Sequence, residues 1–221
     1  MQKRLLVFGG SQFQIPLIKR AKSEGYFVGV FDISETAPAR KYADYFYSVS
    51  LKDREAVLNA AKNFSPDGIT VGMVDIAVPT CAYVAQALNL PGMNLKTAEN
   101  ATDKYKMICA FAAADVPHPK FQLIEKEDSE IAKCNIDYPA IVKPIDMAGS
   151  RGIFLVHNDA EFKRAVKESS KLGDSGKVLV EEYLVGPEVS VELIVKNGKA
   201  HAIQVTDKTT SGAPHFAETG H

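Results

Sequence analysis

The chain has 221 residues, enough for one large domain or two small ones, and its 46% hydrophobic content is ordinary for a soluble globular protein. A formal net charge of -1 argues against a nucleic acid or a membrane surface as the main partner. The three cysteines, Cys81, Cys109 and Cys134, lack any C-x-x-C spacing, so they indicate neither a disulfide framework nor a zinc site and favour a cytoplasmic protein. The apolar run at residues 5–8 is too short for a signal peptide or a membrane span.

The first half alternates short β-rich runs with longer helical runs, which is typical of βαβ units and a parallel sheet. We expect strands at residues 5–8, 27–33 and 68–74, and helices at 15–23, from Asp53 through Ala61, and from Pro79 through Leu88. Pro91-Gly92 ends this pattern, and we place a domain boundary between residues 94 and 95.

Asp32 follows the second expected strand, where a dinucleotide-binding fold keeps its ribose-binding carboxylate. The first turn, residues 9–14, reads Gly-Gly-Ser-Gln-Phe-Gln and lacks the G-x-G-x-x-G order that the pyrophosphate turn needs. We therefore prefer a small ligand at this turn, or a tight βα turn without a ligand, to a dinucleotide.

The second half is predicted to form a small α+β lobe. We expect a helix at residues 103–114, strands at 121–124, 140–143, 153–156 and 178–182, and a helix capped by Asn158 that has Phe162, Ala165, Val166 and Ser169 on one side. Strands at 189–195 and 200–205 flank Asn197-Gly198, a strong hairpin signal, and they need more partner strands than the rest of the chain offers. Residues 207–221 are expected to be a polar loop.

The stretch from Lys143 to Gly152 carries the clearest chemical signal. A lysine that follows the apolar pair Ile141-Val142 can reach a phosphate oxygen, and a loop of small residues can present backbone N–H groups to the same anion. No Gly-Lys-Ser/Thr sequence closes the loop, so it is not a Walker loop. The alternative is an edge-strand lysine followed by an ordinary glycine turn.

Three segments together resemble the ATP-grasp superfamily: Thr102-Asp103-Lys104, the stretch around Lys143, and residues 180–190, Val-Glu-Glu-Tyr-Leu-Val-Gly-Pro-Glu-Val-Ser. Carbamoyl-phosphate synthase large subunit, biotin carboxylase, and the amino-acid and phosphoribosylamine ligases are the most similar in style. The resemblance implies an α/β chain with a Rossmann-like preATP-grasp domain at residues 1–94. An ATP-grasp domain would follow at 95–221, with its α+β small lobe and the beginning of its large lobe, incomplete at the C-terminal end.

The resemblance also implies a nucleotide site with a role for each matching residue. Lys104 and Lys143 match the catalytic, phosphate-binding cations; Gly149, Ser150, Arg151 and Gly152 match the mobile loop over the phosphates; Glu181, Glu182, Tyr183 and Leu184 match the adenine-binding segment; and Glu188 matches the ribose-binding carboxylate. Weaker candidates on the substrate side are Gly10, Ser11, Lys208 and His215. From the residues alone, Glu181 and Glu182 are better explained as solvated side chains at a strand end, and Glu188 as a residue that precedes a hairpin, because exposed glutamates are the usual case.

The implied activity is an ADP-forming ligase that joins a small carboxylic acid to an amine through an acyl phosphate, making a carbon–nitrogen bond. The implied cofactors are ATP and Mg²⁺, with no metal ligand inside this chain and the ligands expected downstream of residue 221. We expect the chain to be a fragment, inactive alone, and leave a homodimer open. The alternative function is an ATP-binding module without turnover. The sequence does not specify the acid or the amine.

Overall fold

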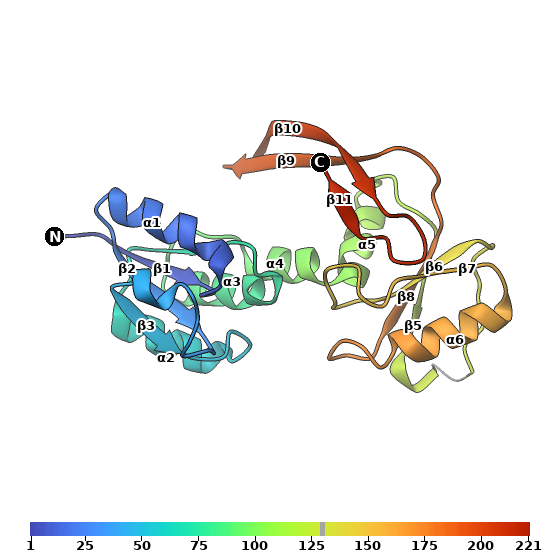
Figure 1. Ribbon diagram of the computed structural model, residues 1–221, viewed down its shortest axis with the longest axis horizontal. Coiled ribbons are helices and arrows are strands. Elements are labelled where there is room, and N and C mark those ends of the chain that lie inside the picture. The colour runs from blue at the N-terminus through green and yellow to red at the C-terminus, as the bar shows by residue number, and fades with distance from the viewer. Residues whose placement is uncertain (129–130) are drawn as a thin grey trace. The chain divides into compact units, whose positions relative to one another are not determined.

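The computed structural model describes residues 1–128 and 131–221, which form two compact units, Met1–Met107 and Ile108–His221 (Figure 1). We expected a boundary between residues 94 and 95. The two compact units divide after Met107, and the helix α4, Leu95–Thr102, belongs to the N-terminal unit. The expected domain boundary remains a prediction. The sequence analysis missed α4, although Asn94 marks its start by accepting a hydrogen bond from the Thr97 backbone at 2.9 Å.

The N-terminal unit is built on a parallel sheet. Its described strands are β1 (Arg4–Phe8), β2 (Phe27–Asp32), β3 (Tyr45–Ser48) and β4 (Gly68–Val71), in the order β3-β2-β1-β4. Every pair of neighbouring strands is parallel. The expected strand at 68–74 ends three residues early, because the chain turns away at Met73, whose φ is +62°. The short strand β3 was not predicted.

Helices cover both faces of this sheet (Figure 1). The described helices of this unit are α1 (Ile15–Ser23), α2 (Arg54–Phe64), α3 (Val78–Ala87) and α4, with short 3-10 turns η1 (Gln12–Gln14), η2 (Arg40–Tyr42) and η3 (Asp75–Ala77). Ile18 of α1 packs with Val7 and Val30 on one face, and Phe64 of α2 packs with Phe8 on the other. Asp53 caps α2 as predicted, accepting a hydrogen bond from Ala56 N–H at 3.0 Å.

The C-terminal unit contains an antiparallel sheet with one helix on one face (Figure 1). Its described strands are β5 (Phe121–Ile124), β6 (Ala140–Pro144), β7 (Phe154–Val156) and β8 (Val178–Glu182), in the order β5-β8-β6-β7. Helix α6 (Asp159–Ser169) lies against Val142, Val178 and Val180. Helix α5 (Lys104–Ala113) begins in the N-terminal unit, and η4 (Lys126–Asp128) follows β5.

A second antiparallel sheet follows in the C-terminal unit. Strands β9 (Glu188–Lys196) and β10 (Lys199–Thr210) form the predicted hairpin, with φ values of +52° at Asn197 and +74° at Gly198. The expected polar loop at 207–221 is wrong in two places, because β10 continues to Thr210 and β11 (Glu218–Gly220) pairs with it. Backbone pairing across the sheet outweighs the polar character of these residues. The hairpin's apolar side chains remain exposed, by 50% for Val191 and 60% for Val205.

No helix in the described part of the chain has both the length and the apolar content needed to cross a lipid bilayer.

Candidate functional site

The pairing of β6 with β8 places Lys143 and Glu181 on the same face of the sheet. Ile141 lies opposite Glu181 in this pairing, and Lys143 lies opposite Leu179. Residues that are directly opposite, or two apart on one strand, share a face. Because Val142 and Val180 point to α6, the face that carries Lys143 and Glu181 is the one that α6 leaves uncovered.

Lys143 and Glu181 form an ion pair on this face, between Nζ and Oε2. Their side chains are only 19% and 14% exposed, which makes this the least exposed of the ion pairs described in the chain. Leu179, the residue opposite the lysine, is fully buried. An ammonium in such surroundings needs a counter-charge, because water reaches it poorly.

The loop after β6 turns through several left-handed residues. Gly149, Ser150 and Gly152 have φ values of +69°, +56° and +76°. A side chain at Gly149 would meet nothing within 4 Å, whereas one at Gly152 would lie 2.7 Å from the Leu172 side chain and 2.9 Å from Pro144. Gly149 therefore leaves room for a ligand beside the backbone, and Gly152 is required by packing.

Several contacts hold this loop in place. The Asp146 carboxylate accepts hydrogen bonds from the backbone N–H groups of Asp174 at 3.0 Å and Ser175 at 2.9 Å. The Ser150 hydroxyl donates to the Phe216 carbonyl at 2.9 Å. Sequence reasoning missed both Asp146 and Phe216 as loop contacts. Asp146 carries a readable signal, since a carboxylate within a small-residue loop commonly accepts backbone N–H groups.

Arg151, the remaining candidate of this loop, donates from Nε to the Ala148 carbonyl at 3.1 Å. This local bond closes the turn, and the side chain is exposed. Its expected contact with phosphate remains a prediction.

The segment that follows β8 leaves the sheet and exposes the apolar side chain of Leu184. Glu182 forms two hydrogen bonds with the backbone of Lys120. Its backbone N–H donates to the Lys120 carbonyl at 2.9 Å, and its carboxylate accepts from the Lys120 N–H at 3.2 Å. Tyr183 N–H donates to the Pro139 carbonyl at 3.4 Å. Leu184 is 62% exposed and is thus free to cover a flat apolar surface. The bonds to Lys120 give Glu182 a structural role, and the expected contacts of Glu182, Tyr183 and Leu184 with adenine remain predictions.

Glu188 and Lys208, which the sequence suggested separately, lie opposite each other on β9 and β10. Lys208 Nζ is 3.2 Å from Glu188 Oε2 and 3.8 Å from Glu218 Oε2. His221 Nε2 is 2.8 Å from Glu218 Oε1. His215 is exposed in the segment between β10 and β11. This end of the hairpin is therefore a charged cluster with one lysine between two glutamates.

Lys104 is the first residue of α5 and belongs to the N-terminal unit, whereas Lys143 belongs to the C-terminal unit. Asp103 caps the first turn of α5, because its Oδ1 accepts a hydrogen bond from Lys106 N–H at 2.9 Å. The expected place of Lys104 beside the same phosphates remains a prediction.

The first turn of the chain, which includes Gly10 and Ser11, is held by two polar side chains. Asp32 accepts the Gly10 N–H at 2.7 Å and the Ser34 N–H at 2.8 Å. Gln14, which is 1% exposed, accepts from the Ser11 backbone and hydroxyl at 2.9 and 2.7 Å. Asp32 thus has a structural role at this turn without a dinucleotide. Binding of a substrate at Gly10 and Ser11 remains a prediction.

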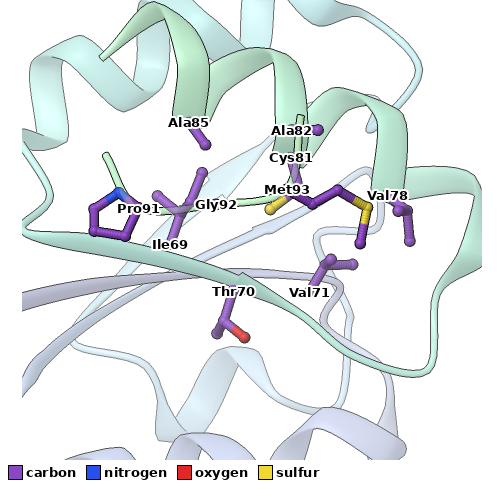
Figure 2. Close-up of a pocket in the computed structure, with 10 residues that line it drawn as sticks. All are labelled: Ile69, Thr70, Val71, Val78, Cys81, Ala82, Ala85, Pro91, Gly92 and Met93. Atoms are coloured by element: carbon purple, nitrogen blue, oxygen red, sulfur yellow. The ribbon is translucent and has the colours of Figure 1, made fainter. Parts of the chain in front are cut away.

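A cavity of about 180 Å³ lies elsewhere in the N-terminal unit, between β4, α3 and the segment that follows α3 (Figure 2). It is lined by Ile69, Thr70, Val71, Val78, Cys81, Ala82, Ala85, Pro91, Gly92 and Met93. Figure 2 shows the lining as apolar side chains apart from the Thr70 hydroxyl and the Cys81 thiol. These residues carry no charge that could hold a phosphate, so we do not place the nucleotide here.

Comparison with known proteins matches the part of the chain that contains Lys143 to a family. Residues 136–221 match the model of the ATP-grasp domain family. These residues are part of an ATP-grasp domain. The expected superfamily and the α/β fold class are therefore confirmed.

Individual relatives come from several ligase-type enzymes. The formate-dependent phosphoribosylglycinamide formyltransferase of Sulfurisphaera tokodaii is 31% identical over 194 residues, which cover 82% of this chain and 47% of the relative. The L-amino acid ligase structure from Bacillus licheniformis has a TM-score of 0.78 and 25% identity, covering 98% of this chain and 53% of that one. N5-carboxyaminoimidazole synthetase from Staphylococcus aureus, complexed with ADP, has a TM-score of 0.79 at 20% identity, covering 99% of this chain and 57% of that one. The chain thus spans about half the length of the relatives it matches.

Proposed function

We propose that the chain supplies the nucleotide-binding side of an ADP-forming ligase that joins a carboxylic acid to an amine. The observation that carries the proposal is Lys143, held on the face of the sheet opposite α6 at the start of a small-residue loop, within an ATP-grasp domain. The ADP complex of the enzyme from Staphylococcus aureus supports a nucleotide as the ligand. The proposed cellular location is the cytoplasm.

The proposed reaction has two steps. An oxygen of the substrate carboxylate attacks the γ-phosphorus of ATP, the bond to the bridging oxygen of ADP breaks, and an acyl phosphate forms. The amine nitrogen then attacks the acyl carbon, phosphate leaves, and the nitrogen loses a proton. Positioning and charge neutralisation dominate the first step, so the protein needs no nucleophile of its own.

The candidate residues divide between the two ends of the nucleotide. Lys143, Lys104 and the backbone N–H groups around Gly149 would neutralise the phosphates. The backbone groups of the segment 181–184 would contact the adenine edge, with the Leu184 side chain against the ring, and Glu188 would accept hydrogen bonds from the ribose hydroxyls. Gly10, Ser11, Lys208 and His215 are proposed to face the acid and the amine.

The relatives suggest which substrates to test first. One is a ligase of L-amino acids and another is a formate-dependent enzyme acting on phosphoribosylglycinamide. An amino acid as the carboxylic acid is therefore the first choice for this chain, and formate with phosphoribosylglycinamide is the second.

Magnesium is expected to accompany ATP, but it has no assigned ligands. Within residues 1–128 and 131–221, no group of three or more His, Cys, Asp or Glu side chains is placed to hold a metal ion. No step above is therefore assigned to a metal.

Calorimetry with ATP and with adenosine tests the phosphate-binding role of Lys143. We expect Lys143→Ala to weaken ATP binding by about tenfold or more, about 1.4 kcal/mol, because a charge-assisted contact is lost. Adenosine binding should stay within about twofold of wild type. Lys167→Ala, which removes an exposed lysine from α6, is the matched control and should change neither affinity. An equal loss for ATP and adenosine in Lys143→Ala would contradict the phosphate role.

Release of ADP tests turnover separately from binding. The measurement is a coupled assay for ADP with ATP, Mg²⁺ and a mixture of L-amino acids, repeated with formate and phosphoribosylglycinamide. Release of ADP that depends on these substrates would support the ligase and contradict the expectation that the chain is inactive alone. ATP binding without ADP release is the result expected both for an inactive fragment of a ligase and for a binding module.

A further inference from the structure

The ion pair between Lys143 and Glu181 bears on how a phosphate reaches the lysine. The two side chains come from neighbouring strands and meet on one face, so the pair is fixed by strand register. Its low exposure, 19% for Lys143 and 14% for Glu181, distinguishes it from the pair of Lys208 with Glu188, at 29% and 56%. Glu181 therefore supplies the counter-charge that the partly buried ammonium group of Lys143 requires.

We infer that Glu181 is an internal counter-ion that competes with phosphate for Lys143, so that triphosphate binding replaces one anionic partner of the lysine by another. The inference rests on the proposed function. It gives Glu181 a role that differs from a contact with adenine, because its carboxylate already lies against the lysine.

Charge sets the sign of the effect. A lysine has three donors, so Lys143 can in principle contact Glu181 and a phosphate together. The two anions would then lie within a few ångströms of each other on a partly buried surface, where like charges repel more strongly than in water. Glu181 must therefore lower the affinity for phosphate, whether the ion pair breaks or is shared.

Replacing Glu181 by glutamine separates this effect from nucleoside recognition. Glu181→Gln keeps the side-chain length and an acceptor oxygen but removes the charge. We expect tripolyphosphate, measured by calorimetry, to bind about fivefold tighter than to wild type, the upper range for a partly exposed ion pair. Adenosine should bind equally well to both. Glu168→Gln on α6 removes an exposed carboxylate away from this face and should leave both affinities unchanged.

A double-mutant cycle shows whether the gain acts through the lysine. In the Lys143→Ala background, Glu181→Gln should no longer increase tripolyphosphate affinity, because the ammonium group for which the carboxylate and the phosphate compete is absent. Glu181→Asp, which keeps the charge on a shorter side chain, should fall between wild type and Glu181→Gln, and it provides a second variant if the glutamine variant does not fold.

The outcomes separate the inference from the proposed function. If Lys143→Ala weakens ATP binding as expected but Glu181→Gln leaves tripolyphosphate binding unchanged or weaker, only the counter-ion role is overturned. A loss of adenosine affinity in Glu181→Gln would instead assign the carboxylate to the nucleoside and overturn the inference in the same way. If wild type binds neither ATP nor tripolyphosphate, the proposed function is refuted, and the inference with it.

Discussion

Substitution of Gly152 by alanine tests whether packing, rather than phosphate approach, requires a glycine at this place in the loop. The backbone there has φ +76°, and an added methyl group would lie 2.7 Å from Leu172 Cδ1, 2.9 Å from Pro144 Cγ and 3.1 Å from Pro144 Cδ. The tip of Leu172 can rotate away. The Pro144 ring is buried at the end of β6 and cannot, so the overlap persists.

Two costs add at Gly152. A left-handed backbone costs a residue with a side chain about 1–2 kcal/mol, and overpacking costs about 1–3 kcal/mol, which gives about 2–5 kcal/mol in total. Gly149→Ala is the matched control in the same loop. Its φ of +69° carries the backbone cost of about 1–2 kcal/mol, but no atom lies within 4 Å of the added methyl group.

Urea unfolding followed by circular dichroism at 222 nm measures both variants against wild type. We expect Gly152→Ala to lose about 1–3 kcal/mol more free energy of unfolding than Gly149→Ala, the overpacking contribution alone. Equal losses in the two variants, or a larger loss for Gly149→Ala, would refute the packing argument. The relief that Leu172→Ala provides in the Gly152→Ala background should be partial, because Pro144 remains.

Two further predictions follow from shifted pKa values. Burial raises the pKa of the Cys81 thiol to about 12, so at pH 8 iodoacetamide should label Cys109 well before Cys81, as read by peptide mass spectrometry; equal rates would contradict this. Burial acts to raise the pKa of Asp44, but hydrogen bonds from Lys22 and a backbone N–H outweigh it and lower the pKa from the ordinary 3.8. The carboxylate therefore stabilises the fold above about pH 4 and loses this effect as pH falls through the lowered pKa. The stability deficit of Asp44→Asn should be present at pH 6 and shrink in acid, and a deficit independent of pH would argue against the ion pair.

The elements that the sequence predicted well depend on local signals. The caps at Asp53 and Asn158 lie within three residues of the N–H groups that they bind, and both start helices where expected. The segments that it missed depend on distant partners. Strand β3 is a four-residue edge strand next to β2, and the end of β10 is a strand because Lys208 pairs with Glu188. A polar composition alone could not reveal these pairings.

The candidate site divides in the same way. Lys143 and its small-residue loop could be predicted, because their chemistry lies in consecutive residues. The contact of Lys143 with Glu181 could not be predicted, because it depends on how β6 and β8 pair. Ile141 lies opposite Glu181, and Lys143, two residues further along β6, reaches the glutamate diagonally on the same face. The Ser150 bond to Phe216 is likewise a contact between segments that are distant in the sequence. Sequence reasoning therefore named most of the expected ligands for phosphate and missed the protein groups that hold them.

The ion pairs also change how the assigned roles combine. The sequence assigned Lys143 to phosphate and Glu181 to adenine, and it treated Glu188 and Lys208 as further independent ligands, yet the structure pairs each lysine with a glutamate. An exposed pair such as Lys208–Glu188 contributes about 0–1 kcal/mol, so a nucleotide can separate it at little cost. The pair of Lys143 with Glu181 is less exposed, and separating it leaves a charge that only another anion can stabilise. If the nucleotide binds as proposed, the pair of Lys143 with Glu181 should determine how much tighter ATP binds than adenosine. The effects of substitutions at Glu181 and Lys143 on ATP affinity should then be strongly non-additive.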